Sequence, residues 1–472
     1  MVTRPERQLI RIGEISARST VSRQRFTVLQ NFRNNFGWTG TFLILFLGTF
    51  PVSAAVLTHG PLVGGVDHQS VKISVRTDVA AEARIQYSTS DGSCAPPQVT
   101  APVVTQQAAD FTAIIELTGL CPVTQYFYSV LVDGVPQVLP FSPSFATFPD
   151  PTESVPFTFT VLADLRGDND VPSVPAPAYA KAASENPAFV MQIGDFDHRG
   201  PRALKAMRKM HKEVRGAETP SGLDFLNAIA CCFPFFHVWD DHDYGPDNGD
   251  KTFSRKAEAL QAFKEYYPTP PLANPSAGIW HSFRYGQAEF FMLDLRSQRD
   301  PNSTVDDATR SMLDGDNIAN GQKDWLKNGL LGSTAKWKFL VSSVTFNRNS
   351  GKRFDAWMGF LSERTELVDF ITSNNISGVI VLSADIHSGG GIDNGSNSDF
   401  PEVTVPHTNL DRTGKGTCVG VGCRPIFWSE GIVSGAEVTG GYAVVTVTTN
   451  PDQVMLQTKD DNGVIGVEFS VE

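Results

Sequence analysis

The segment "CCFPFFHVWDDHDYGPDNGD" covers residues 231–250 and changes character halfway along. Its first half is apolar and aromatic, which is the pattern of a short strand buried on both faces. Its remainder, from residue 240 onward, carries five aspartates around His242. Buried strands of an open α/β sheet present their ligand sites at their carboxyl ends. The segment therefore predicts a strand of such a sheet that delivers acidic side chains to a site.

The same change from apolar to acidic recurs at three other places. The run "TVLAD" ends at Asp164, "IGDFDH" carries Asp195 and His198, and "SADIH" carries Asp385 and His387. Helical patterns separate these runs, so the sequence indicates a layered α/β domain. One terminal aspartate would be read as a helix cap or a turn residue. Four such strand ends together indicate that the side chains converge on one site.

Metal ions are the simplest explanation for such a cluster. Carboxylates that lie close together in a low-dielectric pocket raise one another's pKa, and bound cations remove that conflict. Oxygen and imidazole ligands suit iron, manganese, zinc or calcium, and the sequence has no cysteine cluster for a thiolate site. A shared carboxylate can hold two ions about 3.5 to 4 Å apart. Asp195, on the central loop, is the predicted bridge.

The sequence after residue 55 divides into two predicted domains. Residues 56–148 alternate short strands with turns, which predicts a small antiparallel β-sandwich of the fibronectin III or immunoglobulin type. The proline-rich stretch "FPDPTESVP" follows at residues 148–156 and marks the boundary. Residues 149–472 are the predicted catalytic domain.

The first 55 residues are predicted to be a signal peptide. An arginine-rich region precedes the apolar stretch 38–50, and small residues follow that stretch. Thirteen apolar residues are too few to cross a bilayer comfortably, so we expect a secreted or periplasmic protein without a stable membrane span. An uncleaved anchor and a transit peptide stay open as alternatives. The formal net charge of -12 argues against nucleic acid or an anionic membrane as the main partner.

Six cysteines make disulfides plausible in an exported chain. Two pairs are expected from their spacing: Cys94 with Cys121, and Cys418 with Cys423. The neighbours Cys231 and Cys232 lie in an apolar run and are expected to be buried thiols rather than an adjacent pair.

Five motifs carry a resemblance to a known family. The motifs "ADLRGD", "GDFDHRG", "WDDHDYG", "LDLRSQR" and "SADIHSGG" occur in this order. Together they resemble the alkaline phosphatase D family of the calcineurin-like metallophosphoesterases. The resemblance implies a four-layer α/β/β/α catalytic domain behind the β-sandwich. It also implies a dinuclear metal centre of iron, calcium or both, with manganese and zinc as further options, that hydrolyses phosphomonoesters and some phosphodiesters.

The resemblance assigns roles residue by residue. Asp195 would bridge both metals, Asp164 and His387 would complete one site, and Asp241 and Asp385 would belong to the other. His242 would face the substrate as general acid rather than bind metal.

Two positions depart from the family pattern. The family often has Cys at the position of Asp164 and Tyr at that of His198, so the metal identity stays open. His198 can still coordinate, because imidazole suits several of the same metals.

The expected reaction is in-line attack on phosphorus by a hydroxide activated between the metals, without a phosphoenzyme. Asp241, His242 and Arg296 are the predicted catalytic residues, and Arg166 is an alternative to Arg296. Either arginine could instead pair with a carboxylate.

Two other functions stay open at this point. The first is a phosphodiesterase of the same fold, of phospholipase D-like or nucleotide-cleaving type. The second is a secreted, calcium-stabilised binding protein whose acidic loops hold structural ions.

Overall fold

The computed structural model describes residues 54–90, 92, 94, 97–165, 174–350, 355–409, 424–434 and 438–472. The predicted signal peptide lies almost entirely outside these residues, as do Arg166 and the expected pair of Cys418 and Cys423. The chain from Ser53 to Glu472 forms one compact unit. No helix built from the described residues is long and apolar enough to cross a membrane.

Two antiparallel sheets occupy the stretch that was predicted to be a β-sandwich. The first contains β1 (Leu57–Gly64), β2 (Ser70–Thr77) and β6 (Thr112–Thr118). The second is built on β3 (Glu82–Thr89) and β7 (Gln125–Val132), with β4 (Gln98–Val99), β5 (Val103–Val104), β8 (Val135–Pro136) and β9 (Ser144–Ala146) at its edges. Their inward side chains belong to the same hydrophobic cluster. The predicted antiparallel strands are therefore present, and their assignment to the fibronectin III or immunoglobulin type stays a prediction.

Two larger sheets of seven strands each follow. One runs β12 (Phe235–Val238), β11 (Val190–Ile193), β10 (Phe157–Leu165), β21 (Gly441–Thr449), β22 (Asp452–Asp460) and β23 (Ile465–Val471), with β19 (His407–Asn409) beside β10. The other runs β13 (His281–Tyr285), β14 (Ala288–Met292), β15 (Trp337–Val341), β16 (Val379–Ser383), β18 (Glu402–Thr404), β17 (Gly391–Asp393) and β20 (Gly431–Ile432). Strands β10 to β12 are mutually parallel, as are β14 to β16. Strand β21 pairs antiparallel with β10.

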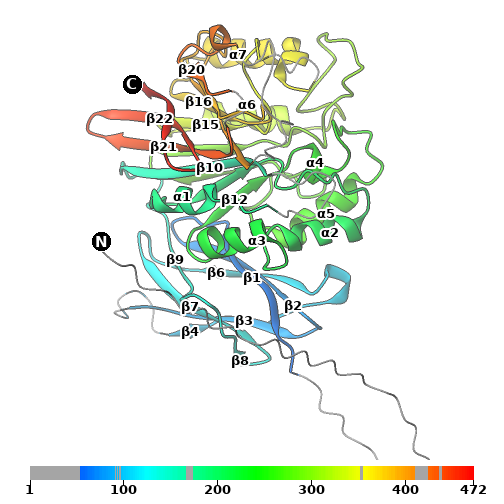
Figure 1. The fold of residues 1–472 in the computed structure, drawn as a ribbon, viewed down its shortest axis with the longest axis vertical. Coiled ribbons are helices and arrows are strands. Elements are labelled where there is room, and N and C mark those ends of the chain that lie inside the picture. Colours follow the sequence, from blue (N-terminus) through cyan, green and yellow to red (C-terminus); the bar gives the residue numbers. More distant parts are fainter. Residues whose placement is uncertain are drawn as a thin grey trace, which may run out of the picture. The chain divides into compact units, whose positions relative to one another are not determined.

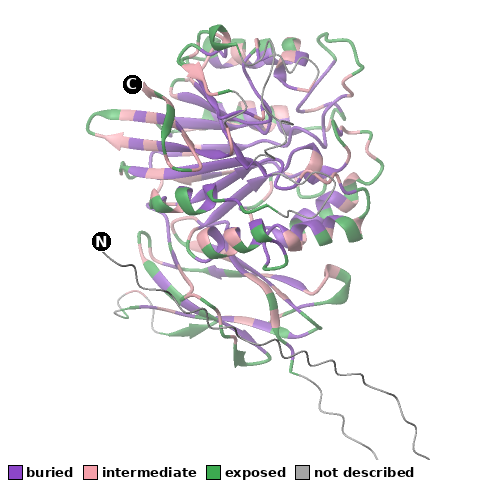
Figure 2. Cartoon of the chain, viewed as in Figure 1, coloured by how far each residue is buried: buried purple, intermediate pink, exposed green. Residues whose placement is uncertain are grey.

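The two large sheets meet through aromatic side chains. Phe159 of β10 makes edge contacts with Phe290 of β14 and Phe339 of β15, at ring distances of 5.2 and 5.4 Å. Figure 2 shows that the strands of both sheets are largely buried. The predicted mixed α/β architecture is confirmed, and its core lies between the sheets.

Helices cover the sheets on their outer sides (Figure 1). Those beside the first sheet are α1 (Ala178–Ser184), α2 (Leu204–Glu213), α3 (Pro220–Phe225) and α5 (Lys256–Tyr266), while α6 (Gln322–Gly332) and α7 (Leu361–Ser373) lie beside the second. The C-terminal end of α5 and the residues after it also contact the small sheets. Ser74 donates a hydrogen bond to the carbonyl of Tyr266 at 3.2 Å, and Lys72 donates one to the carbonyl of Thr269, beyond the helix, at 3.0 Å.

The cysteines give one confirmation and one correction. Cys94 is bonded to Cys121, as expected. Cys231 and Cys232 are bonded to each other, so the prediction of two buried thiols was wrong. Cys231 is buried, but Cys232 is exposed. The reason is local: a single π-helical turn over Leu226–Ala230 leads directly into the pair, and the buried strand begins only at Phe235.

Candidate metal centre

The first group of candidate ligands gathers side chains from the ends of three strands. Asp164 lies near the end of β10, Asp195 and His198 follow β11, and His387 follows β16. Each of the four offers a ligand atom within 4.8 Å of the others. His198 Nε2 lies 3.0 Å from Asp195 Oδ2, and His387 Nε2 lies 3.5 Å from Asp164 Oδ1. The sequence had assigned all four to metal binding.

Hydrogen bonding orients the ring of His198. Its Nδ1 donates to the carbonyl of Leu165 at 2.8 Å, which leaves Nε2 to face the carboxylates. Metal-binding histidines usually use their second nitrogen in this way, because the hydrogen bond fixes both the tautomer and the ring orientation.

The second group consists of Asp195, Asp241 and His242. Asp241 and His242 open the short helix α4 (Asp241–Tyr244), which follows β12 directly. The backbone N–H of His242 donates to Asp195 Oδ1 at 3.3 Å and to Asp241 Oδ1 at 3.0 Å. Asp195 belongs to both groups, which is the position that a bridging ligand must occupy.

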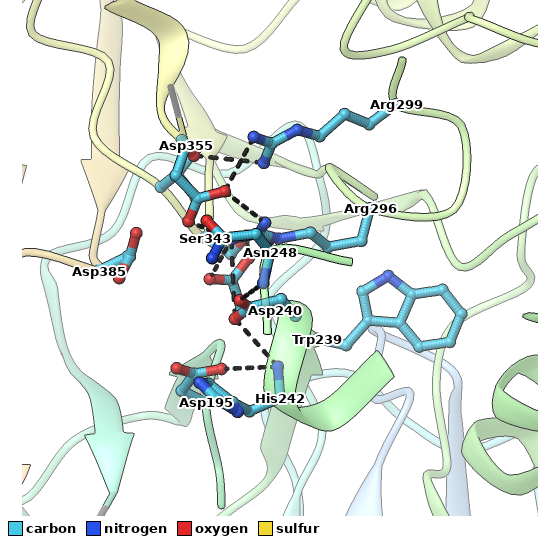
Figure 3. Close-up of polar contacts among 12 residues, drawn as sticks. Asp195, Trp239, Asp240, His242, Asn248, Arg296, Arg299, Ser343, Asp355 and Asp385 are labelled. Carbon is cyan, nitrogen blue, oxygen red and sulfur yellow. Dashed lines mark hydrogen bonds and ion pairs between the residues drawn. The ribbon is translucent and has the colours of Figure 1, made fainter. Parts of the chain in front are cut away.

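Asp385 is the predicted ligand that neither group includes. Its Oδ1 lies 3.7 Å from His387 Nε2, so it borders the first group, whereas the sequence had paired it with Asp241. Figure 3 shows it on the opposite side of the site from Arg296.

Four of the candidate ligands have an unusual backbone conformation. Asp164, Asp195, Asp385 and His387 have positive φ values of 51°, 46°, 57° and 49°. Residues other than glycine rarely adopt this left-handed conformation, and its cost is tolerated mainly where function requires it. Gly194 precedes Asp195 with φ of 98°, and a Cβ at this position would lie 2.8 Å from the Cβ of Asp240.

The charged side chains of the first group strongly shift one another's pKa values. Burial opposes ionisation of Asp195, but the charge and hydrogen bond of His198 outweigh it, with help from His242 and His387, and its pKa falls well below the ordinary value. For His198, burial works against protonation, and Asp195 and Asp164 overcome it, so its pKa lies well above the ordinary value. The carboxylates of the first group therefore favour a positive charge beside them, which a bound cation would supply.

A buried ion-pair network lies behind the second group (Figure 3). Arg296 donates from Nε to Asp240 Oδ1 at 2.5 Å and from Nη1 to Asp355 Oδ1 at 2.8 Å. Arg299 donates to the same Asp355 oxygen at 2.8 Å, and Ser343 donates to Asp240 Oδ1 at 2.7 Å. Asp240 directly precedes Asp241, so these hydrogen bonds fix the position at which α4 begins.

Arg296 is the central residue of this ion-pair network. Its side chain is fully buried and pairs with Asp240 and Asp355, and its nearest approach to Asp241 is 3.8 Å. Burial disfavours the charged form of its guanidinium, but the surrounding aspartates outweigh this effect and raise its pKa well above the ordinary value. Arg296 therefore forms the carboxylate pairs that the sequence left open as an alternative, and its predicted catalytic role stays a prediction.

Other aspartates of the opening segment also take supporting positions. Asp240 and Asp243 form a capping box at the start of α4, and Asp243 also accepts from the backbone of Phe196 at 2.9 Å. Asp247 is exposed and lies 3.6 Å from Nε2 of His242. The backbone N–H of Asn248 donates to Asp241 Oδ2.

Fold and site together define a class: a two-sheet α/β protein whose strand ends assemble two groups of carboxylates and imidazoles around one shared aspartate. Comparison with known proteins gives the family. The model of PhoD-like phosphatases matches residues 172–405, and a domain of unknown function (DUF7800) matches residues 54–150. Residues 172–405 thus match the PhoD-like phosphatase family.

One curated relative and two solved structures extend this finding. The chain is 27% identical to alkaline phosphatase D of Bacillus subtilis (strain 168) over 314 residues, which cover 58% of this chain and about half of that relative, 53%. The structure of PhoD matches with a TM-score of 0.67 at 20% identity, covering 87% of this chain and 89% of that chain. A purple acid phosphatase from yellow lupin (Lupinus luteus) seeds matches with a TM-score of 0.56 at 13% identity, covering 89% and 74%. Both matches show that this chain shares its fold with the matched structure.

Proposed function

We propose that the protein is a metal-dependent phosphoesterase that hydrolyses phosphate esters at a dinuclear centre. The observation that carries this proposal is the position of Asp195, which belongs to both groups of candidate ligands. Two cations that share one carboxylate match the arrangement that phosphoesterases use to clamp the attacking and leaving oxygens. The match to the PhoD-like phosphatase family supports the same chemistry.

The described residues fit such a centre. Three buried polar atoms, Asp164 Oδ2, His387 Nε2 and His242 Nδ1, have no hydrogen-bond partner within the described part of the chain. Buried polar atoms are nearly always satisfied, so several orphans in one place indicate a ligand. The donors are oxygen and nitrogen atoms, which suit iron, manganese, zinc or calcium.

The residues divide into two metal sites. Asp164, His198 and His387 would hold one cation and Asp241 the other, with Asp195 between them and Asp385 beside the first site. When bound, the cations would stabilise developing negative charge and lower the pKa of water. In-line attack on phosphorus by the resulting nucleophile would need no phosphorylated side chain.

His242 is the proposed proton donor to the leaving oxygen. Its side chain is 20% exposed, compared with 6% for Asp241, so it can reach a substrate that enters from solvent. Its backbone N–H is held by both neighbouring carboxylates, which fixes the position of the residue. A positioned histidine of this kind contributes about 10²- to 10⁴-fold to a rate.

We also infer that the protein is exported and that the large domain has the four-layer arrangement of its family. The disulfides Cys94–Cys121 and Cys231–Cys232 support an oxidising compartment. The two small sheets would then form the amino-terminal β-sandwich.

The test is hydrolysis of an aryl phosphate by the purified, metal-replete chain. A chelator should abolish phosphate release while the protein stays folded, and His242→Ala should lower the rate at least about 10²-fold. His68→Ala, outside both groups, is the control. Release of no phosphate by the metal-replete protein, or an unchanged rate in the His242 variant, would overturn the proposal. In the former case, tightly bound calcium would favour the binding-protein alternative.

A further inference from the structure

His407 is a buried histidine that the proposed function does not use. It begins β19 and is fully buried. Its sequence neighbourhood carries no cluster of acids or histidines, so no local pattern singles it out. Strand pairing nevertheless places it beside the first metal group, because β19 runs parallel to β10 with His407 opposite Ala163, the residue before Asp164.

His407 holds the loop that carries His387. Both its backbone N–H and its ring Nδ1 donate to the carbonyl of Ser388, at 3.1 and 2.6 Å. Ser388 is the residue after His387, which has a strained positive φ of 49°. Two hydrogen bonds onto one carbonyl thus fix the backbone next to a candidate ligand.

The second ring nitrogen, Nε2, differs from Nδ1 in its surroundings. Because a carbonyl oxygen can only accept, Nδ1 carries the proton in this contact, and a neutral ring leaves Nε2 as a bare acceptor. Nε2 is buried and finds no hydrogen-bond partner among the described residues. The ring interacts electrostatically with Asp164, His387 and His198, three members of the first group. It is not itself a member, so it borders the ligand set rather than completing it.

We infer that His407 is a positioning residue of the first metal site, which fixes His387 through the Ser388 carbonyl. The inference rests on the proposed function and adds a residue to it. Residues that orient metal ligands typically change metal affinity about 10- to 100-fold when they are replaced.

The experiment measures Mn²⁺ affinity of the full-length chain by titration calorimetry and Mn²⁺ paramagnetic resonance. His407→Leu removes both the ring donor and the free acceptor and should weaken Mn²⁺ binding at the first site at least about 10-fold. His407→Asn keeps a donor at the position of Nδ1 and should recover most of this loss. Recovery by the asparagine variant separates a positioning role from simple loss of core volume.

His281 provides a matched control. It is equally buried, its Nδ1 bonds the carbonyl of Ile279 at 2.7 Å, and its Nε2 likewise finds no partner among the described residues. It belongs to neither metal group. His281→Leu should therefore lower the melting temperature of the metal-free protein as His407→Leu does, but leave Mn²⁺ affinity unchanged.

The outcomes separate the two proposals. If the wild type binds no Mn²⁺ and no other cation restores phosphatase activity, the proposed function fails and this inference fails with it. If the wild type binds Mn²⁺ and His407→Leu binds it equally well, or if His281→Leu loses as much affinity, only the role of His407 is overturned.

Discussion

The two ligand groups that meet at Asp195 are held in place by different means. The first takes its side chains from three separate strand ends, largely through backbones with positive φ, and contains buried polar atoms that find no hydrogen-bond partner in the described part of the chain. Apart from the shared Asp195, the second lies on a single helical turn, and hydrogen bonds among Arg296, Asp240, Asp355 and Ser343 hold the start of that turn. The first group therefore depends on its cation for its balance of charge, whereas the second is organised before any cation binds.

The largest expected effect comes from removing the residue that both groups share. Asp195→Asn should lower phosphate release by about 10³-fold or more, because both cations lose a ligand and their charge stabilisation is worth several kcal/mol. Metal analysis should show loss at both sites. Asp164→Asn is the comparison, because it should empty only the first site. Equal metal loss in the two variants would show that the groups are not independently organised.

The next effect should be on stability. Arg296→Met leaves the buried Asp240 and the half-buried Asp355 without this partner, and breaking a buried pair such as Arg296–Asp240 costs about 3 to 5 kcal/mol of unfolding free energy. Denaturant unfolding of the metal-free protein measures this cost. Arg84→Met removes an exposed pair with Glu82 and should cost about 1 kcal/mol or less. Similar costs for the two variants would contradict a pre-organised second group.

A pH-dependent effect should appear at Glu402, which lies behind the loop to Asp385. Its carboxylate accepts from the Ser383 hydroxyl and from the backbone of Phe346. Burial raises its pKa from 4.5 to about 7, against hydrogen bonds that lower it. The folded state thus favours the protonated form, and the associated stability is present below pH 4.5 and lost as pH rises through 7.

Glu402→Gln should therefore gain stability relative to the wild type between pH 5 and pH 8, by up to about 3 kcal/mol. Melting temperatures across this range measure the difference. Glu468→Gln, at an exposed position, is the control for removing a charge. A difference between wild type and Glu402→Gln that does not change with pH would contradict the raised pKa.

The smallest effect is expected at Asp247. Its carboxylate is 73% exposed and lies 3.6 Å from His242 Nε2. Exposed ion pairs contribute little, so Asp247→Asn should change the hydrolysis rate only about two- to threefold. Kinetics at low and high salt measure this change, which salt should weaken further. A loss as large as that of His242→Ala would show that Asp247 takes part in the proton transfer.

The sequence revealed the metal group because each ligand follows a buried apolar run. Strand ends are readable from local pattern, and the rule that sites lie at the carboxyl ends of strands brings Asp164, Asp195 and His387 together. The pairing of Arg296 with Asp355 could not be predicted in this way. Asp355 lies outside every strand-end motif, and its pairing depends on how distant loops pack.

His407 and the cysteine pair were missed for similar reasons. His407 reaches the site through the register of β19 on β10, which no local pattern encodes. The bond between Cys231 and Cys232 depends on a π-helical turn, whereas the surrounding composition indicated a continuous buried strand.

The placement of Asp164 and His387 on different sheets has a consequence for the order of folding. Asp164 ends a strand of the first large sheet, and His387 follows a strand of the second, so the first cation site does not exist until both sheets have formed and met. Contacts of such long sequence separation form late, because the intervening chain must be ordered first. Uptake of the first cation would therefore report completed assembly, and time-resolved metal binding during refolding would follow the last step rather than the first.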